Sequence, residues 1–273
     1  MAADAALAPL WQDAGLPHEA LHFVDLDGGE PVLPSSFPVA TGAQASLAAA
    51  AAAAAQIWHH RTGERQRVRV DIVHAALDSC GYFSIDGRVP NIWDKLSGVY
   101  PCGGDIGEPG WVRIHANFAH HRDGALRLLG CEPGDATGRE AVTQALGAWR
   151  AEDFETAAAE AGLVVAAARD FAAWDRHPQG RALAGTPPVR IERIADAPPA
   201  PPLVWPAVTA DASPLAGLRV LALTRILAGP VAGRTLAAYG AEVMLVNSPH
   251  LPNIEAIADT SRGKLSTHID LKT

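Results

Sequence analysis

The sequence has little of what a disulfide framework, an export signal or a membrane span would need. Its three cysteines (Cys80, Cys102 and Cys131) are an odd number and include no CxxC pair, which suits a reducing compartment. No apolar run approaches the roughly 18 residues of a membrane span, and the N-terminus lacks the basic region of an export signal. We therefore expect a cytoplasmic protein without a membrane partner.

Positive charge is also scarce, with 22 Lys and Arg against 30 Asp and Glu and a net charge of −8. Because phosphate backbones are bound by clustered Lys and Arg, nucleic acid is not expected as a partner. Apolar residues are abundant at 48%, which excludes wholesale disorder and supplies a core. At about 150 residues per domain, the 273 residues correspond to one large domain or two modest ones.

Several signatures of cofactor and nucleophile chemistry are missing. The stretch TRILAGP, which follows a short apolar run, matches neither GxGxxG nor GxxxxGK[ST]. Asn247 stands where a dinucleotide enzyme has an acidic residue. The eleven histidines include no HExxH, and their adjacent pairs at 59–60 and 120–121 would diverge on a helix. No GxSxG elbow is present, so we expect neither a metal site nor a permanently bound cofactor.

Periodicity predicts alternating helices and strands over the first 185 residues. An alanine-rich helix is expected over 44–60, with Gly63 as its terminator. Polar and apolar residues alternate over 67–72 and 111–115, which is typical of half-buried strands. The other expected elements are a short helix at 74–80, a Gly/Pro-rich loop at 101–110, helices between 122 and 169, and a short buried strand at 163–167.

Seven prolines between 187 and 206 predict a linker and the clearest boundary in the chain. Beyond it, 218–223 is typical of a buried parallel strand, Pro230 suits a first helical turn, and 242–246 forms a second strand. This βαβ unit brings a helix N-terminus to the end of a strand, where an anion is favoured. The basic turn Ser261–Lys264 fits either a phosphate site or a solvated turn.

Two motifs lie close together near the end of the sequence: PLAGLRVLALTRILAGPVAGRTLAAYGAEVMLVNSPH from Pro214 and SRGKLSTHIDLK from Ser261. They resemble the opening of the family III CoA-transferases, the CaiB/BaiF family. That family begins with "PL-x-G-x-RVLDLTR-x-x-AGP…LADLGAEV-x-KVE-x-P" and continues with "NRGKRS-x-x-LDLK". The resemblance implies an α/β fold with a Rossmann-like parallel sheet and a smaller α/β region.

Upstream segments resemble later parts of the same family. RTGERQRVRVDIVHAA is similar to its "TG-x-GQ-x-VDVSLLDAA", and WVRIHANFAHHRDGALRLLG to the start of its small domain. The predicted order is a partial copy over 1–190 with a small-domain-like part at about 100–185, a linker over 187–213, and a new family beginning over 214–273. This order suggests a fused or permuted architecture.

The resemblance implies an enzyme that transfers CoA between carboxylic acids through an acyl intermediate on an aspartate. Acyl-CoA and a carboxylic acid would be its substrates, and an interlocked homodimer its assembly. The family's "GYD-x-x-x-QA" nucleophile segment is not found, and Asp25 and Asp27 lack its surroundings. We therefore assign no catalytic residue and expect a C-terminally truncated form. The alternatives are an acyl-CoA racemase of the same superfamily, which needs an acid–base pair, or an inactive CoA-binding or scaffold half.

Matching the family motifs position by position implies a set of CoA contacts. Gly229 and Pro230 would shape the first turn. Ala222 and Asn247 depart from the family's usual Asp and Glu. The implied contacts are Ile226, Leu227 and Ala228 in the first loop, Asn247 and Ser248 after the second strand, and Arg262 and Lys264 in the basic turn.

Overall fold

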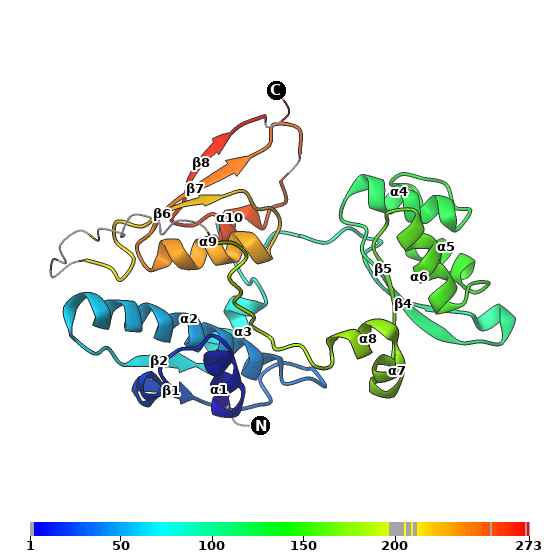
Figure 1. Cartoon of the computed structure of the whole chain (residues 1–273). Coiled ribbons are helices and arrows are strands. Elements are labelled where there is room, and N and C mark those ends of the chain that lie inside the picture. The colour runs from blue at the N-terminus through cyan, green and yellow to red at the C-terminus, as the bar shows by residue number, and fades with distance from the viewer. Residues whose placement is uncertain are drawn as a thin grey trace. The chain divides into compact units, whose positions relative to one another are not determined.

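The computed structural model describes residues 3–196, Trp205, Thr209, 212–251, 253–270 and Lys272. The chain forms an α/β protein with two compact units (Figure 1). One unit combines Met1–Pro90 with Pro187–Thr273, and the other is Asn91–Thr186. Residues 187–196 form no helix or strand, and most of the rest of the predicted linker lies outside the described residues.

The first part of the larger unit is built around one long helix, α2, as the alanine-rich sequence predicts. Its buried Ala45 and Ala48 pack against α1 and the strands β1 and β2, because alanine lets neighbouring backbones approach closely. Gly63 ends the helix at φ 79°, as predicted. The elements are α1 (Ala3–Asp13), the 3-10 turn η1 (His18–Phe23), β1 (Val24–Asp27), α2 (Val39–Thr62), β2 (Val68–Asp71) and α3 (Ile72–Ser79).

Strands β1 and β2 pair in parallel, and a buried glutamine side chain bonds to the backbone of both near their carboxyl ends. The side chain of Gln44, which is 1% exposed, donates to the carbonyls of Asp27 and Val70 at 2.9 and 2.8 Å. Asp71 ends β2 and accepts hydrogen bonds from the first amides of α3, which fixes the start of that helix. Among the described residues no helix is both long and apolar enough to cross a membrane.

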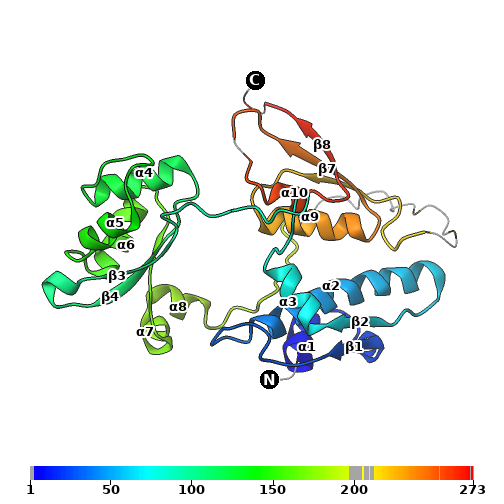
Figure 2. The same ribbon diagram turned by 180° about the vertical axis from the view of Figure 1, so that it is seen from behind.

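The second part of the larger unit contains the βαβ unit expected from the sequence. Its strands run parallel in the order β6-β7-β8, with α9 on one face (Figure 2). Leu215, Ala222, Val243 and Leu245 are the buried core under α9. The elements are β6 (Arg219–Ala222), α9 (Ala228–Ala238), β7 (Glu242–Asn247), the short α10 (Ile257–Thr260) and β8 (Leu265–His268).

Strand β6 is not buried on both faces, which corrects the expectation from its apolar sequence. Leu221 and Leu223 are 65% and 61% exposed, whereas Ala222, which points to the opposite face, is 5% exposed. The reason is that α9 covers only the face of Ala222 in the described part of the unit. A continuous apolar run indicates a strand, but it does not show how many of its faces are covered.

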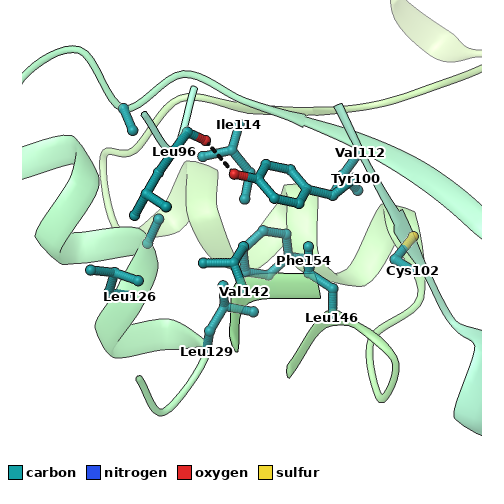
Figure 3. Packing of buried hydrophobic residues seen from close by; sticks show 12 residues of the cluster. Leu96, Tyr100, Cys102, Val112, Ile114, Leu126, Leu129, Val142, Leu146 and Phe154 are labelled. Carbon is teal, nitrogen blue, oxygen red and sulfur yellow. Dashed lines mark hydrogen bonds between the residues drawn. The ribbon is translucent and has the colours of Figure 1, made fainter. Parts of the chain in front are cut away.

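The smaller unit packs helices on one face of an antiparallel sheet ordered β3-β4-β5. Its core gathers around Phe154 and Tyr100, whose hydroxyl donates to the Leu96 carbonyl at 2.7 Å (Figure 3). The elements are β3 (Gly98–Cys102), the 3-10 turn η2 (Gly104–Ile106), β4 (Gly110–Ile114), α4 (Ala119–Leu128), α5 (Arg139–Leu146), α6 (Ala151–Glu160), β5 (Val165–Ala167), α7 (Phe171–Arg176) and α8 (Pro178–Leu183).

Strand β3 overlaps the stretch 101–110 that was expected to be loop, so that expectation is wrong at its start. Pro101 lies in β3, opposite Trp111 of β4. A proline is tolerated there because β3 is an edge strand, which needs donors toward only one neighbour.

Candidate functional site

Three parallel strands end beside the N-terminus of α9, and a pocket of about 390 Å³ lies at these carboxyl ends. We call it the carboxyl-end pocket. The chain leaves β6 through Thr224–Leu227, and the amide of Val231 donates to the Leu227 carbonyl at 2.8 Å to start α9. The pocket is lined by Leu223, Thr224, Arg225, Val246, Asn247, Ser248, His250, Leu251, Ile269, Asp270 and Lys272.

The lining combines apolar walls with charged groups of both signs. Leu223, Val246, Leu251 and Ile269 supply the apolar surface. A histidine–carboxylate pair also lines the pocket, because His250 Nε2 lies 3.0 Å from Asp270 Oδ2. The His250 side chain is 70% exposed and that of Asp270 26%. A carboxylate bonded to one ring nitrogen fixes the imidazole tautomer and leaves the other nitrogen for proton transfer.

Asn247 and Ser248 line the pocket, as their position after the second strand suggested. Asn247 is buried and its amide donates to Ser266 Oγ at 2.9 Å, which fastens β7 to β8. Ser248 Oγ accepts from the His250 amide at 3.3 Å. Asn247 therefore supports the wall of the pocket, while Ser248 holds the turn that presents His250.

Ile226, Leu227 and Ala228 do not line the pocket; their predecessors Leu223 to Arg225 do. Ile226 has φ 72°, a left-handed conformation that is rare for a β-branched residue, while Leu227 is 51% exposed. These three residues therefore form the turn between the pocket lining and α9. Contact of Ile226, Leu227 and Ala228 with CoA stays a prediction, and the wall that the chain forms after β8, with Ile269 and Asp270, was not expected from the sequence.

Thr224 and Gly229 meet closely where the loop enters α9. A Cβ atom at Gly229 would lie 2.5 Å from Thr224 Cγ2, so only glycine fits this position without a shift. The Thr224 hydroxyl is buried and has no hydrogen-bond partner among the described residues. The glycine matched to the family's AGP motif thus has a packing role here, because it lets α9 approach Thr224, a residue of the pocket lining.

Arg262 and Lys264 lie away from the carboxyl-end pocket and are already bonded. Arg262 pairs with Asp259 at 2.7 Å. Lys264 donates to the Pro230 carbonyl at 2.7 Å. Burial, with a smaller contribution from the charge of Arg234, lowers the pKa of Lys264 below its usual 10.5. The basic turn therefore supports α9 and its surroundings and does not reach the pocket.

The carboxylates of Asp25 and Asp27, which the sequence also offers as candidates, are engaged in ion pairs. Asp25 is paired with Arg67 at 2.8 Å, and Asp27 is paired with Arg69, on the exposed edge of the β1–β2 pair. Within the residues that the structure describes, no three His, Cys, Asp or Glu side chains gather in the way a metal ion requires.

The comparisons identify the segment that forms this pocket. A family model described as CoA-transferase family III matches residues 215–273. Residues 215–273 thus form a CoA-transferase family III segment. The matched residues include β6, α9, β7 and β8 and all the residues that line the carboxyl-end pocket.

Two curated relatives of this chain are transferases of CoA derivatives by name. An acyl-CoA transferase of Gibberella moniliformis is 33% identical over 236 residues, covering 76% of this chain and 41% of that protein. The acetyl-coenzyme A transferase nodX of Hypoxylon pulicicidum is 40% identical over 72 residues, covering 24% of this chain and 12% of that protein. The chain thus spans about two fifths of the length of the first relative.

Solved structures similar to this chain include those of Rv3272 from Mycobacterium tuberculosis. One, described as a hypothetical protein, is 39% identical over 23% of this chain and 20% of its own, with a TM-score of 0.21. The D175A mutant of Rv3272 is 17% identical over 75% of this chain and 57% of its own, with a TM-score of 0.42.

Proposed function

We propose that the protein is an acyl-CoA:carboxylate CoA-transferase and that the carboxyl-end pocket is where this chain contacts acyl-CoA. The observation that carries the proposal is the position of the pocket. It lies at the carboxyl ends of parallel strands, within the family III segment. Ligands of open α/β sheets bind at such edges, because loops diverge there and free amides face outward.

The chemistry of the pocket suits the two ends of such a ligand. A short acyl chain and the methyl and methylene groups of a pantetheine arm are apolar and match Leu223, Val246 and Leu251. Arg225 and Lys272 bring positive charge to the same rim, where the phosphates of CoA carry negative charge. The transfer step itself would use an aspartyl intermediate, as in the family, and we assign that aspartate to no residue of this chain.

Calorimetric titration with CoA tests the contact, using two leucines of the same strand end. Leu223 and Leu221 are similarly exposed and point to the same face of the sheet, but only Leu223 lines the pocket. We expect Leu223→Glu to weaken CoA binding at least about tenfold, which is about 1.4 kcal/mol. Leu221→Glu should leave the affinity unchanged. Equal effects of both substitutions, or no heat at millimolar CoA, would contradict the proposal.

The His250–Asp270 pair favours one second candidate, an acyl-CoA racemase of the same superfamily. Racemisation requires a base to remove the α-proton of the acyl group, and His250 is a proton acceptor on the pocket wall. Incubation with an acyl-CoA in D₂O separates the two reactions. Deuterium at the α-carbon without movement of CoA to an added acid would indicate the racemase. Transfer of CoA without α-exchange would indicate the transferase, and binding with neither would indicate an inactive scaffold.

A further inference from the structure

The larger unit is assembled from two stretches of chain that are far apart in sequence, and arginine side chains join them. Arg61 at the end of α2 belongs to Met1–Pro90, and its Nη1 donates to the carbonyls of Ser213, Pro214 and Ala216 at 3.4, 2.7 and 3.3 Å. Its guanidinium also lies 4.6 Å from the ring centroid of Trp205. The Arg61 side chain thus binds the turn that leads into β6.

A second arginine, which belongs to the C-terminal stretch, binds a residue of the N-terminal stretch. Arg234 of α9 donates to both carboxylate oxygens of Asp78 at 3.0 Å, and its other nitrogen donates to Asp259 at 2.7 Å. Its side chain is only 11% exposed, as is that of Asp259. Asp78 lies in the last turn of α3, where the helix dipole disfavours a negative charge. Pairing with Arg234 compensates for that position.

Between the two joints the stretches are not fully packed together. A second pocket of about 370 Å³, the seam pocket, is lined by Leu47 and Asp78 from one stretch and by α9 and Arg262 from the other. Ile57 of α2 packs against the core under α9. The two arginine joints therefore add specific polar contacts to this apolar packing. Removing one partner of a poorly exposed ion pair is costly, because the other charge is left without compensation.

We propose that Met1–Pro90 and the stretch 212–273 form a stable non-covalent pair, held by the reciprocal Arg61 and Arg234 joints. A single cut in the chain between Thr186 and Ala212 should therefore leave them together. The proposal also explains why Arg262 is engaged by Asp259, because this ion pair extends the Arg234 joint across the basic turn. It is independent of any ligand at the carboxyl-end pocket.

The test cuts the full-length chain once and asks whether the pieces stay together. A site-specific protease sequence is placed within 190–196, a described and exposed stretch without helix or strand. After complete cleavage, the pieces should co-elute in size-exclusion chromatography at the 28.5 kDa of the intact chain. Separation of the wild-type pieces at micromolar concentration would overturn the proposal.

Variants then test the joints themselves. We expect the combination Arg61→Gln with Asp78→Asn to lower the affinity between the cleaved pieces at least about tenfold. Arg219→Gln is the matched control, because Arg219 pairs with Glu242 inside one stretch and is 87% exposed. If the double variant does not fold before cleavage, as judged by circular dichroism, Asp78→Asn alone replaces it. An affinity equal to that of the wild type in the folded variant would overturn the assigned role of the joints.

Discussion

Ile226 lies in a left-handed conformation between β6 and α9, with φ 72°. A side chain in this region costs about 1–2 kcal/mol. Such outliers persist where surrounding structure imposes them, often next to binding sites. Here the imposing features are the close contact of Thr224 with Gly229 and the start of α9 at Ala228.

Replacing Ile226 by glycine and by alanine isolates this cost, because both changes remove the half-buried side chain. Glycine relieves the strain, whereas alanine keeps it. We expect the Gly variant to be more stable than the Ala variant by about 1 kcal/mol, the reverse of the order in an ordinary helix or strand. Urea unfolding of both variants measures this difference. An Ala variant at least as stable as the Gly variant would show that the turn is not strained.

Lys264 gives the larger unit a defined pH dependence. Its folded-state pKa lies below the usual 10.5, chiefly because of burial. Between these two pKa values the unfolded chain binds more protons than the folded chain, so this residue makes stability rise with pH up to about 10.5. The stability of the wild type relative to Lys264→Met should therefore increase between pH 7 and pH 10. A difference that is the same at both pH values would contradict the burial of the ammonium group.

At the scale of elements, two glycines in the turn between β3 and β4 allow the cost of a steric clash to be measured apart from the cost of a positive φ. Gly103 and Gly107 both have positive φ, at 72° and 73°. A Cβ at Gly103 would lie 1.9 Å from the Glu108 carbonyl oxygen, whereas at Gly107 it would meet nothing within 4 Å. We expect Gly103→Ala to destabilise the smaller unit by about 1–3 kcal/mol more than Gly107→Ala. Equal losses in thermal unfolding would show that the turn can shift.

Local signals predicted most helices and several strands from the sequence. Strands 218–223 and 242–246 and the helix between them were found because hydrophobic runs, Pro230 and Gly240 mark their limits. Strand β3 was missed because Pro101 and the neighbouring glycines resemble a loop, and its identity depends on pairing with β4. The exposure of Leu221 was missed because it depends on which elements cover the sheet.

Two of the residues selected from the sequence lie at the end of β7 and line the carboxyl-end pocket. Asn247 is the last residue of β7 and Ser248 follows it. Their contact with CoA stays a prediction. Arg225, His250 and Asp270 were not selected, since they meet only when the ends of β6 and β7 are brought beside the chain leaving β8. Arg262 and Lys264 were selected by motif, but local partners hold them elsewhere.

At the scale of the whole molecule, the two stretches of the larger unit meet through pairs more than 150 residues apart, such as Arg61 with Pro214 and Asp78 with Arg234. No periodicity or motif records such pairs, so their contact could not be foreseen. The predicted order of family segments over 1–190 and 214–273 stays a prediction, as do the homodimer and the cytoplasmic location. The match to the CoA-transferase family III model covers residues 215–273.

Hydrogen exchange of the intact chain with and without acetyl-CoA tests the central claim most directly. Acetyl-CoA in the carboxyl-end pocket should slow exchange of the amides over 223–225 and 247–251, at the ends of β6 and β7. Exchange in Asn91–Thr186 should not change. Protection confined to Asn91–Thr186 or to the seam pocket, or no protection at millimolar acetyl-CoA, would contradict the account.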